Sequence, residues 1–169
     1  MGLLELLKKA LSAYDRLAYY ILTFLLSLIA VILFTNVIFR YFFYAAFSWA
    51  EELTLFLMIW VAGIAARPAL KSGEFITIDS LQRKLSKTSP IALLIVRIIV
   101  LAAIFVYLLV VLVSGIDLCL KVQRQTSPML VISMAIPYAA MPFGALVMLI
   151  TAVEQLVQTL KEGKKEIEP

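Results

Sequence analysis

Four long, nearly uncharged stretches dominate the pattern of hydrophobic and polar positions along the chain. A helix rises 1.5 Å per residue, so about 20 apolar residues cross the roughly 30 Å hydrocarbon core of a bilayer. The pattern therefore predicts an all-α integral membrane protein with four transmembrane helices. We expect these helices over residues 17–42, 48–70, 90–118 and 127–157.

The placement of polar residues and prolines affects two of these spans. The second stretch is long enough only if its helix begins near Ser48 and includes Glu51 and Glu52. The fourth has Pro128 near its start and two interior prolines, which predict a kink. The first stretch is too long for a signal-peptide core, and no small-residue cleavage site follows it, so we expect it to be retained.

Two amphipathic segments, residues 2–16 and 75–87, lie outside the predicted spans. In each, apolar side chains fall on one helical face and charged side chains on the others, which is typical of helices lying in the membrane interface. The second segment is also consistent with a short solvated connector. The charged tail, residues 163–169, is expected to be disordered. Residues 1–169 are thus expected to form a single membrane domain.

The distribution of basic residues predicts the orientation in the membrane. Cytoplasmic loops are enriched in Lys and Arg, so the side with more of them is taken as the inside. Both termini are then cytoplasmic, as in a multi-pass protein of a bacterial inner membrane. The residues placed inside are Lys8, Lys9, Arg16, Arg67, Lys71, Arg83, Lys84, Lys87, Lys161, Lys164 and Lys165, and those placed outside are Arg40, Lys121 and Arg124.

Composition excludes several function classes. The chain is 63% hydrophobic and 15% charged, and its net charge of +4 is spread between apolar blocks, which argues against a nucleic-acid partner. Histidine is absent and Cys119 is the single cysteine. Haem, zinc and disulfide-exchange sites need several such ligands, so we expect no catalytic residue, no metal site and no cofactor. Cys119 is interpreted as a small apolar filler.

Arg40, Glu51 and Glu52 are the first candidate site, because they fall at similar depth near the outer ends of the first two helices. A charge inside a membrane costs several kcal/mol, and a partner of opposite sign reduces this cost. Adjacent helical residues point about 100° apart. We therefore expect one glutamate to pair with Arg40 and the other to face a second protein. Two alternatives are that both glutamates reach outer water, or that they form a cation relay.

Arg67 and Lys71 end the second predicted helix on the cytoplasmic side. They suit the carbonyl groups at a helix C-terminus and the phosphates of phospholipids. Together with Arg83 and Lys84 they are predicted to act as interfacial anchors. A plain helix stop followed by a loop also explains most of this segment.

A set of short motifs follows in a fixed order along the four predicted helices. The motifs are Asn36-Val37-Ile38-Phe39-Arg40-Tyr41, Trp49-Ala50-Glu51-Glu52, Trp60, Gly73 with Ile76, Ile78 and Asp79, Ser127-Pro128, Ile136-Pro137-Tyr138, and Pro142 with Gly144. In their order and spacing they resemble a known family, the small membrane subunit (DctQ type) of tripartite ATP-independent periplasmic (TRAP) transporters. The resemblance covers roughly residues 15–160, and Glu74 stands where the family typically has His.

The resemblance implies a partner and a role. Family members associate with a large multi-helix subunit that holds the substrate and sodium sites, and a periplasmic binding protein delivers an organic acid such as sialic acid or a C4-dicarboxylate. The small subunit is expected to act as a scaffold. Arg40, Lys121 and Arg124 are then candidate contacts for the binding protein, although ordinary snorkelling to the interface explains them as well. The competing function is a self-contained homodimeric four-helix exporter.

Overall fold

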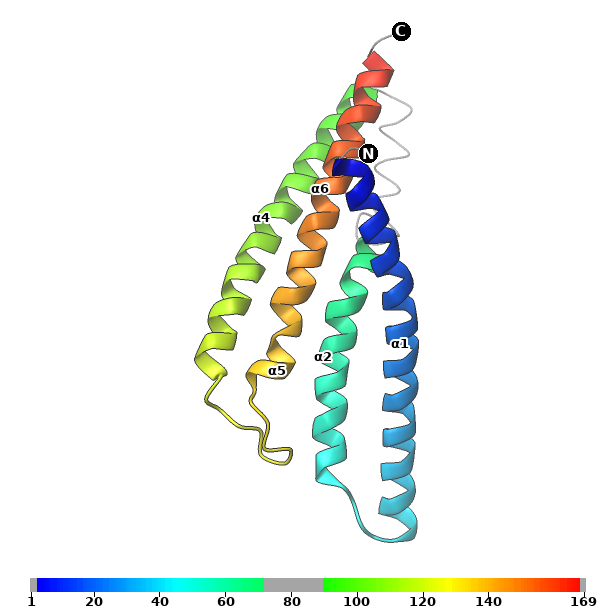
Figure 1. Cartoon of the computed structure of the whole chain (residues 1–169), viewed down its shortest axis with the longest axis vertical. Coiled ribbons are helices and arrows are strands. Elements are labelled where there is room, and N and C mark those ends of the chain that lie inside the picture. Colours follow the sequence, from blue (N-terminus) through cyan, green and yellow to red (C-terminus); the bar gives the residue numbers. More distant parts are fainter. Residues whose placement is uncertain (1–2, 72–89, 168–169) are drawn as a thin grey trace.

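The computed structural model describes residues 3–71 and 90–167, and every element in them is helical apart from the connecting loops (Figure 1). The helices are α1 (Leu3–Phe42), α2 (Ser48–Lys71), α4 (Pro90–Val122), α5 (Ala135–Tyr138) and α6 (Ala140–Ile167). Four of them are long and apolar enough to cross a membrane, in agreement with the prediction.

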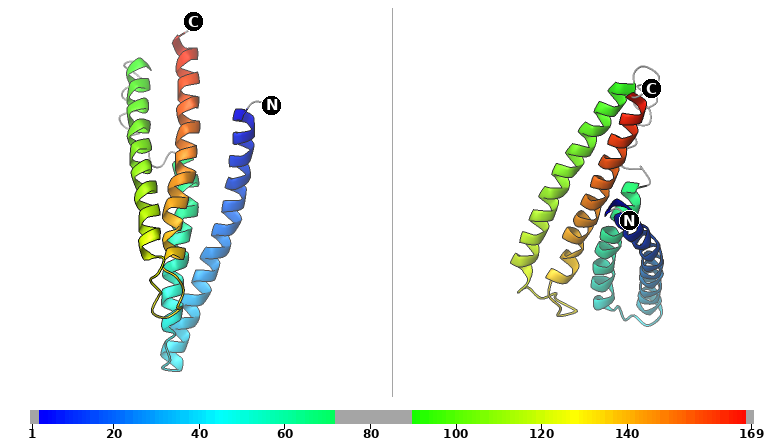
Figure 2. Two further views of the ribbon diagram at one scale, coloured as in Figure 1. Left: turned by 60° about the vertical axis from the view of Figure 1, so that its left-hand side comes forward. Right: turned by 45° about the horizontal axis from the view of Figure 1, so that its top comes forward.

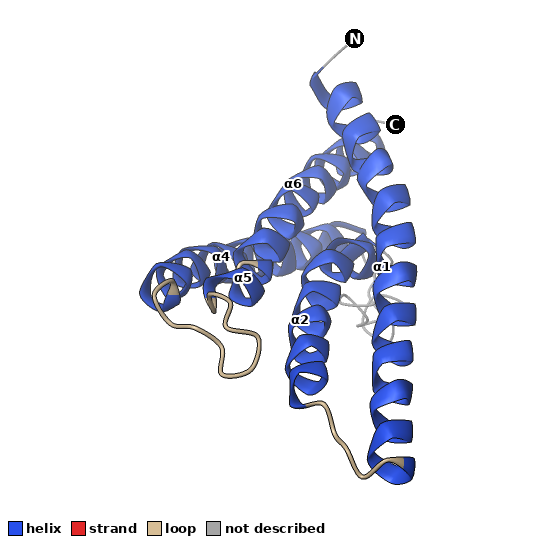
Figure 3. Cartoon of the chain, turned by 60° about the horizontal axis from the view of Figure 1, so that its bottom comes forward, coloured by secondary structure: helices blue, strands red, loops and turns tan. Residues whose placement is uncertain are grey.

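The four long helices lie in a row rather than in a closed bundle. α1 packs on α2, α2 packs on α6 and α6 packs on α4, so α1 and α4 form the two edges (Figures 1 and 2). The short α5 adjoins the start of α6 and contacts α2 and α4. Figure 3 shows α1 beside α2 at one side of the row and α4 beside α6 at the other.

Most large apolar side chains on the edge helices are exposed. Phe24 and Phe34 on α1 and Val113 on α4 are each about two-thirds exposed. The internal core is small, and one cluster of it joins Leu108 of α4 to Leu149 of α6. A soluble domain does not leave so much apolar surface uncovered, so lipid or another membrane protein must cover these faces.

The bounds of the first three long helices differ from the predicted spans mainly in length. Residues 3–16 form no separate interfacial helix, because they continue without a break into the first span. At 40 residues, α1 is about 60 Å long, twice the hydrocarbon thickness. α2 ends one residue beyond the predicted span, and α4 extends four residues beyond position 118.

The predicted start of the fourth helix at residue 127 is wrong. Residues 123–134 form a loop closed by backbone hydrogen bonds from Ser127 N to Ile132 O (2.8 Å) and from Met134 N to Gln125 O (2.9 Å). Pro128 explains this, because proline disfavours helical geometry at the residue before it. Val131 also has φ of 54°, which a helix does not allow.

The two interior prolines of the predicted fourth span lie where a helix tolerates them. Pro137 falls in the four-residue α5 and Pro142 in the first turn of α6, where a missing N–H breaks no internal hydrogen bond. The kink was expected at these two prolines, and the helix is indeed interrupted between them, at Ala139, which separates α5 from α6. α6 itself continues to Ile167 and covers most of the predicted disordered tail. The predicted interfacial helix 75–87, with Arg83, Lys84 and the neighbouring Glu74, lies outside the described residues.

Candidate functional site

The candidate site of this chain consists of polar and close-packed contacts between its helices. In residues 3–71 and 90–167, no three His, Cys, Asp or Glu side chains lie close enough together to hold a metal ion. Polar contacts between helices instead gather in two places, toward the two opposite ends of the long helices. We call them the Arg67 end and the Glu52 end, after the residue at the centre of each.

The Arg67 end is built around a buried guanidinium. Arg67 on α2 is 1% exposed. Its Nε donates to Asp15 Oδ1 on α1 (2.7 Å), and its Nη2 donates to Asp15 Oδ2 (3.3 Å). Its Nη1 donates to the Thr151 hydroxyl on α6 (2.6 Å) and lies 3.7 Å from Glu154 Oε2. The buried charge is therefore paired and hydrogen-bonded by side chains of two neighbouring helices, α1 and α6, and burying a charge is tolerated under this condition.

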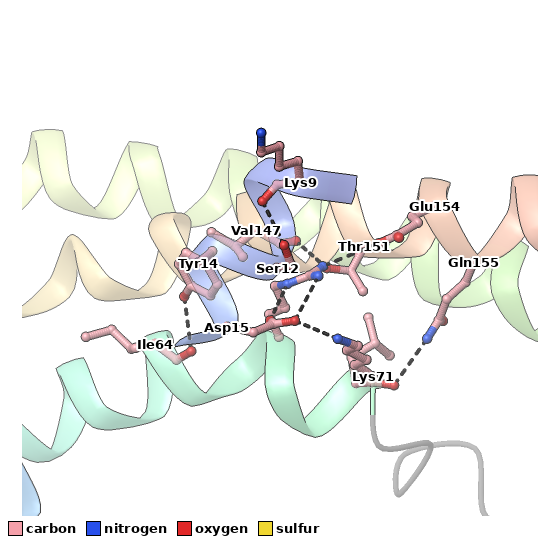
Figure 4. A network of polar contacts seen from close by, with 12 residues as sticks. Lys9, Ser12, Tyr14, Asp15, Ile64, Lys71, Val147, Thr151, Glu154 and Gln155 are labelled. Carbon is pink, nitrogen blue, oxygen red and sulfur yellow. Dashed lines mark hydrogen bonds and ion pairs between the residues drawn. The ribbon is translucent and has the colours of Figure 1, made fainter. Parts of the chain in front are cut away.

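Two further bonds tie the same helices together at this end. Figure 4 shows the Tyr14 hydroxyl of α1 donating to the Ile64 carbonyl of α2 (3.1 Å), and the Gln155 amide of α6 donating to the Leu70 carbonyl (3.3 Å). Asp15 also accepts a bond from Lys71 Nζ at 2.7 Å. These contacts fix the position of α1 relative to α2 and of α2 relative to α6.

This arrangement corrects the expectation that Arg67 anchors the helix to lipid phosphates. The guanidinium is covered by protein and has a carboxylate partner in its own chain. Lys71 is 60% exposed at its side chain, which leaves it free to reach water or lipid while it pairs with Asp15. The signal missed in the sequence was Asp15, an acidic residue two positions before the first predicted span, which the structure places at the level of Arg67.

Between the Arg67 end and the Glu52 end, small residues bring α2 and α6 into close contact. A Cβ placed on Gly63 would lie 2.6 Å from the Ala140 carbonyl oxygen, and a Cβ on Gly144 would lie 3.0 Å from the Gly63 carbonyl oxygen. A milder approach joins α4 to α6, where a Cβ on Gly115 would lie 3.1 Å from Pro142 Cδ. Close backbone approach at small residues is a common mode of helix packing in membranes.

At the Glu52 end, Arg40 and Glu51 are paired between α1 and α2. Both side chains are about half exposed. The same hairpin is closed by the Phe47 N–H, which donates to Asn36 Oδ1 (2.9 Å), and Tyr44 has φ of 52° in the turn.

Glu52 points away from the Arg40–Glu51 pair and toward the loop between α4 and α5. Its Oε2 accepts hydrogen bonds from the backbone N–H groups of Met129 (3.0 Å) and Leu130 (2.9 Å). The expectation that this second glutamate faces another protein is thus replaced by a contact within the chain. The structure separates the two adjacent glutamates, one holding the α1–α2 hairpin and the other the loop.

The remaining predicted contacts lie at the same end. Lys121 pairs with Asp117 one turn earlier on α4, with Nζ 2.6 Å from Oδ2 and both side chains exposed. Arg124 is exposed in the loop that follows. Arg40, Lys121 and Arg124 therefore share one end of the molecule, but Arg40 and Lys121 each already have a carboxylate neighbour.

Four membrane-length helices, tied at both ends and close-packed at glycine, define a multi-pass membrane protein. Residues 29–162 match the family described as the DctQ component of tripartite ATP-independent periplasmic transporters, and the chain belongs to this family. Membership makes it the small membrane component of a TRAP transporter and implies association with a large membrane subunit and a periplasmic binding protein. The comparison with curated proteins finds no match.

Proposed function

We propose that this chain is the scaffold subunit of a sodium-driven TRAP transporter. In this proposal it holds the large membrane subunit during uptake of an organic acid of the sialic acid or C4-dicarboxylate class. Family membership supports the transporter role. The substrate class and the sodium coupling come from the family resemblance.

The observation that carries the scaffold role is the fixed packing of α1, α2 and α6. Arg67 joins all three helices with a fully buried charge, and Gly63 locks α2 against the α6 backbone. A scaffold needs helices that keep their relative positions while a partner moves. Buried, fully paired polar groups and glycine-mediated backbone contacts resist such sliding.

The distribution of charge supports a scaffold over an exporter. An exporter that binds a cation in its own bundle needs an acidic residue near mid-membrane. Within the four membrane-length spans of the described residues, the acidic residues lie toward the span ends, at Asp15, Glu51, Glu52, Asp117 and Glu154. Asp15, Glu51, Glu52 and Asp117 also have partners within the chain.

For the orientation, the proposal places the Arg67 end in the cytoplasm and the Glu52 end outside a bacterial inner membrane. The positive-inside bias of the sequence supports this placement. The exposed Arg40, Lys121 and Arg124 then face the compartment of the binding protein. Charged residues on that surface would steer a soluble partner more than they would add to its affinity.

Reconstitution in liposomes tests the proposed function. Liposomes containing this chain, the co-purifying large subunit and added binding protein should accumulate a labelled organic acid when a sodium gradient is applied. Liposomes with the large subunit but without this chain should lose most of that uptake. Uptake by this chain alone would instead support the self-contained transporter.

A further inference from the structure

The edge helix α4 has two exposed faces of different chemistry. One, which we call the apolar face, consists of Val106, Leu109, Val113, Ile116 and Leu120. The other, which we call the Tyr107 face, consists of Ala103, Tyr107, Val110 and Ser114. Successive members of each set are alternately three and four residues apart in sequence, so each set lies along one side of the helix.

Tyr107 lies near the middle of the membrane span. It is ten positions after Arg97 and fourteen before Lys121, which is about 15 Å and about 21 Å along the helix axis. Tyrosine favours the two membrane–water interfaces, where its hydroxyl reaches water. Tyr107 is 67% exposed, yet its depth puts that hydroxyl far from either interface.

The Tyr107 phenol finds no hydrogen-bond partner among the described residues. Hydroxyls in the middle of α1 behave differently. Thr23 donates to the Tyr19 carbonyl and Ser27 to the Thr23 carbonyl, each at 2.8 Å. Ser114 can satisfy its hydroxyl in the same way, whereas a tyrosine cannot, because the aromatic ring carries its oxygen away from its own backbone. Tyr107 therefore needs a partner from outside the chain.

Lipid tails cannot supply this partner, because they contain no hydrogen-bond acceptor. A helix of another membrane protein can, with a backbone carbonyl or a polar side chain at mid-membrane depth. Ala103 and Ser114 on the same face are small and allow such a helix to approach closely. The apolar face offers no polar group and suits lipid.

We propose that the Tyr107 face of α4 is the surface on which the large TRAP membrane subunit packs, with an acceptor of that subunit receiving the Tyr107 hydroxyl hydrogen. The inference rests on the proposed function, because family membership supplies the identity of the partner. It assigns the Tyr107 face of α4 to the partner protein and the neighbouring apolar face of the same helix to lipid.

Site-specific photo-crosslinking in the intact complex tests this assignment. A benzophenone amino acid is introduced at Tyr107, at Val113 on the apolar face, or at Phe34 on α1. These three side chains are 67%, 66% and 69% exposed, so the sites are matched for accessibility. The Tyr107 site should give a product containing the large subunit, at least fivefold more than either control.

Three outcomes would overturn the assignment: a large-subunit product mainly at Phe34 or Val113, a Tyr107 product containing only a second copy of this chain, or no product at Tyr107. If no large membrane protein co-purifies with the unaltered chain, the proposed function itself fails, which separates the two failures.

The substitution Tyr107→Phe tests the hydrogen bond alone. It should lower the amount of co-purified large subunit by about threefold to tenfold, which corresponds to the worth of one polar contact between membrane helices. The melting temperature of the isolated chain should stay unchanged, because the hydroxyl has no partner among the described residues. Unchanged co-purification would remove the proposed bond.

Discussion

Arg67 and Asp15 form a bidentate ion pair between α2 and α1. Arg67 is 1% exposed, and the Asp15 side chain is 21% exposed. Fifty-two positions of sequence separate them. Because Arg67 also bonds Thr151 on α6, the pair connects three of the four long helices. We take this contact as the main polar determinant of how the row of helices is assembled.

Replacing Asp15 with asparagine should destabilise the chain substantially. The change keeps the shape of the side chain but leaves the buried Arg67 charge without its main partner, which costs about 3 kcal/mol. In a chain of this size that corresponds to a fall in melting temperature of roughly 6–12 °C. The melting temperature is measured by thermal unfolding in detergent, with the folded fraction monitored by size-exclusion chromatography.

Lys71→Gln provides the matched control for this prediction. Lys71 contacts the same carboxylate, but its side chain is 60% exposed, so losing its pair should cost less than about 1 kcal/mol. A Lys71→Gln variant that melts as low as Asp15→Asn would show that burial of Arg67 is not the source of the effect.

Gly63→Ala should destabilise the chain despite the better helix propensity of alanine. Alanine gains up to about 1 kcal/mol over glycine inside a helix. At position 63, however, the new methyl would lie 2.6 Å from a backbone oxygen of α6, and overpacking of this kind costs about 1–3 kcal/mol. The expected result is a lower melting temperature.

Gly115→Ala is the graded comparison, since its methyl would meet the Pro142 ring at 3.1 Å and a small shift relieves the contact. It should be tolerated better than Gly63→Ala. Equal melting temperatures for the two variants would contradict the close packing of α2 on α6.

Glu52→Ala should loosen the loop over residues 125–134. The carboxylate accepts the backbone N–H groups of Met129 and Leu130, and bonds to a charged acceptor contribute about 1.5–3 kcal/mol each. Hydrogen exchange at these two amides should therefore become at least about tenfold faster. Glu51→Ala, one position away, should leave both amides unchanged, and equal acceleration in both variants would count against the contact.

Arg40→Ala should change stability by less than about 1 kcal/mol, because the Arg40–Glu51 pair is half exposed on both sides. The melting temperature of the purified chain reports this effect. If Arg40 contacts the binding protein, the same variant should slow association of that protein with the complex, measured by surface plasmon resonance at low salt. A large loss of stability would instead mean that the pair is shielded from water.

The lengths of the four apolar stretches alone predict an all-helical protein with four spans. A chain that crosses the hydrocarbon core must form long apolar helices or a closed β-barrel, because lipid cannot satisfy open backbone polar groups. The second span was located from Ser48 and the two glutamates, and α2 begins at that residue. The fourth helix was placed too early, because the apolar run from Met129 to Ile132 looks helical by composition. Pro128 and the positive φ of Val131 are instead incompatible with a helix, and these residues form a hydrogen-bonded loop.

The candidate site was only partly accessible from the sequence. The proximity of Arg40, Glu51 and Glu52 followed from the short connection between two helices. The pairing of Arg67 with Asp15 did not, because it depends on how α1 is rotated against α2. The separate role of Glu52 likewise depended on the loop after α4, whose path the hydrophobic pattern does not specify.

Affinity purification of the tagged chain from its native membrane in mild detergent tests the scaffold role most directly. The account predicts that one much larger, multi-helix membrane protein elutes with the chain in equal molar amount. It also predicts that Tyr107→Phe reduces this partner while the chain itself remains folded. Recovery of the chain alone, or only as a homodimer that transports a solute unaided, would contradict the account.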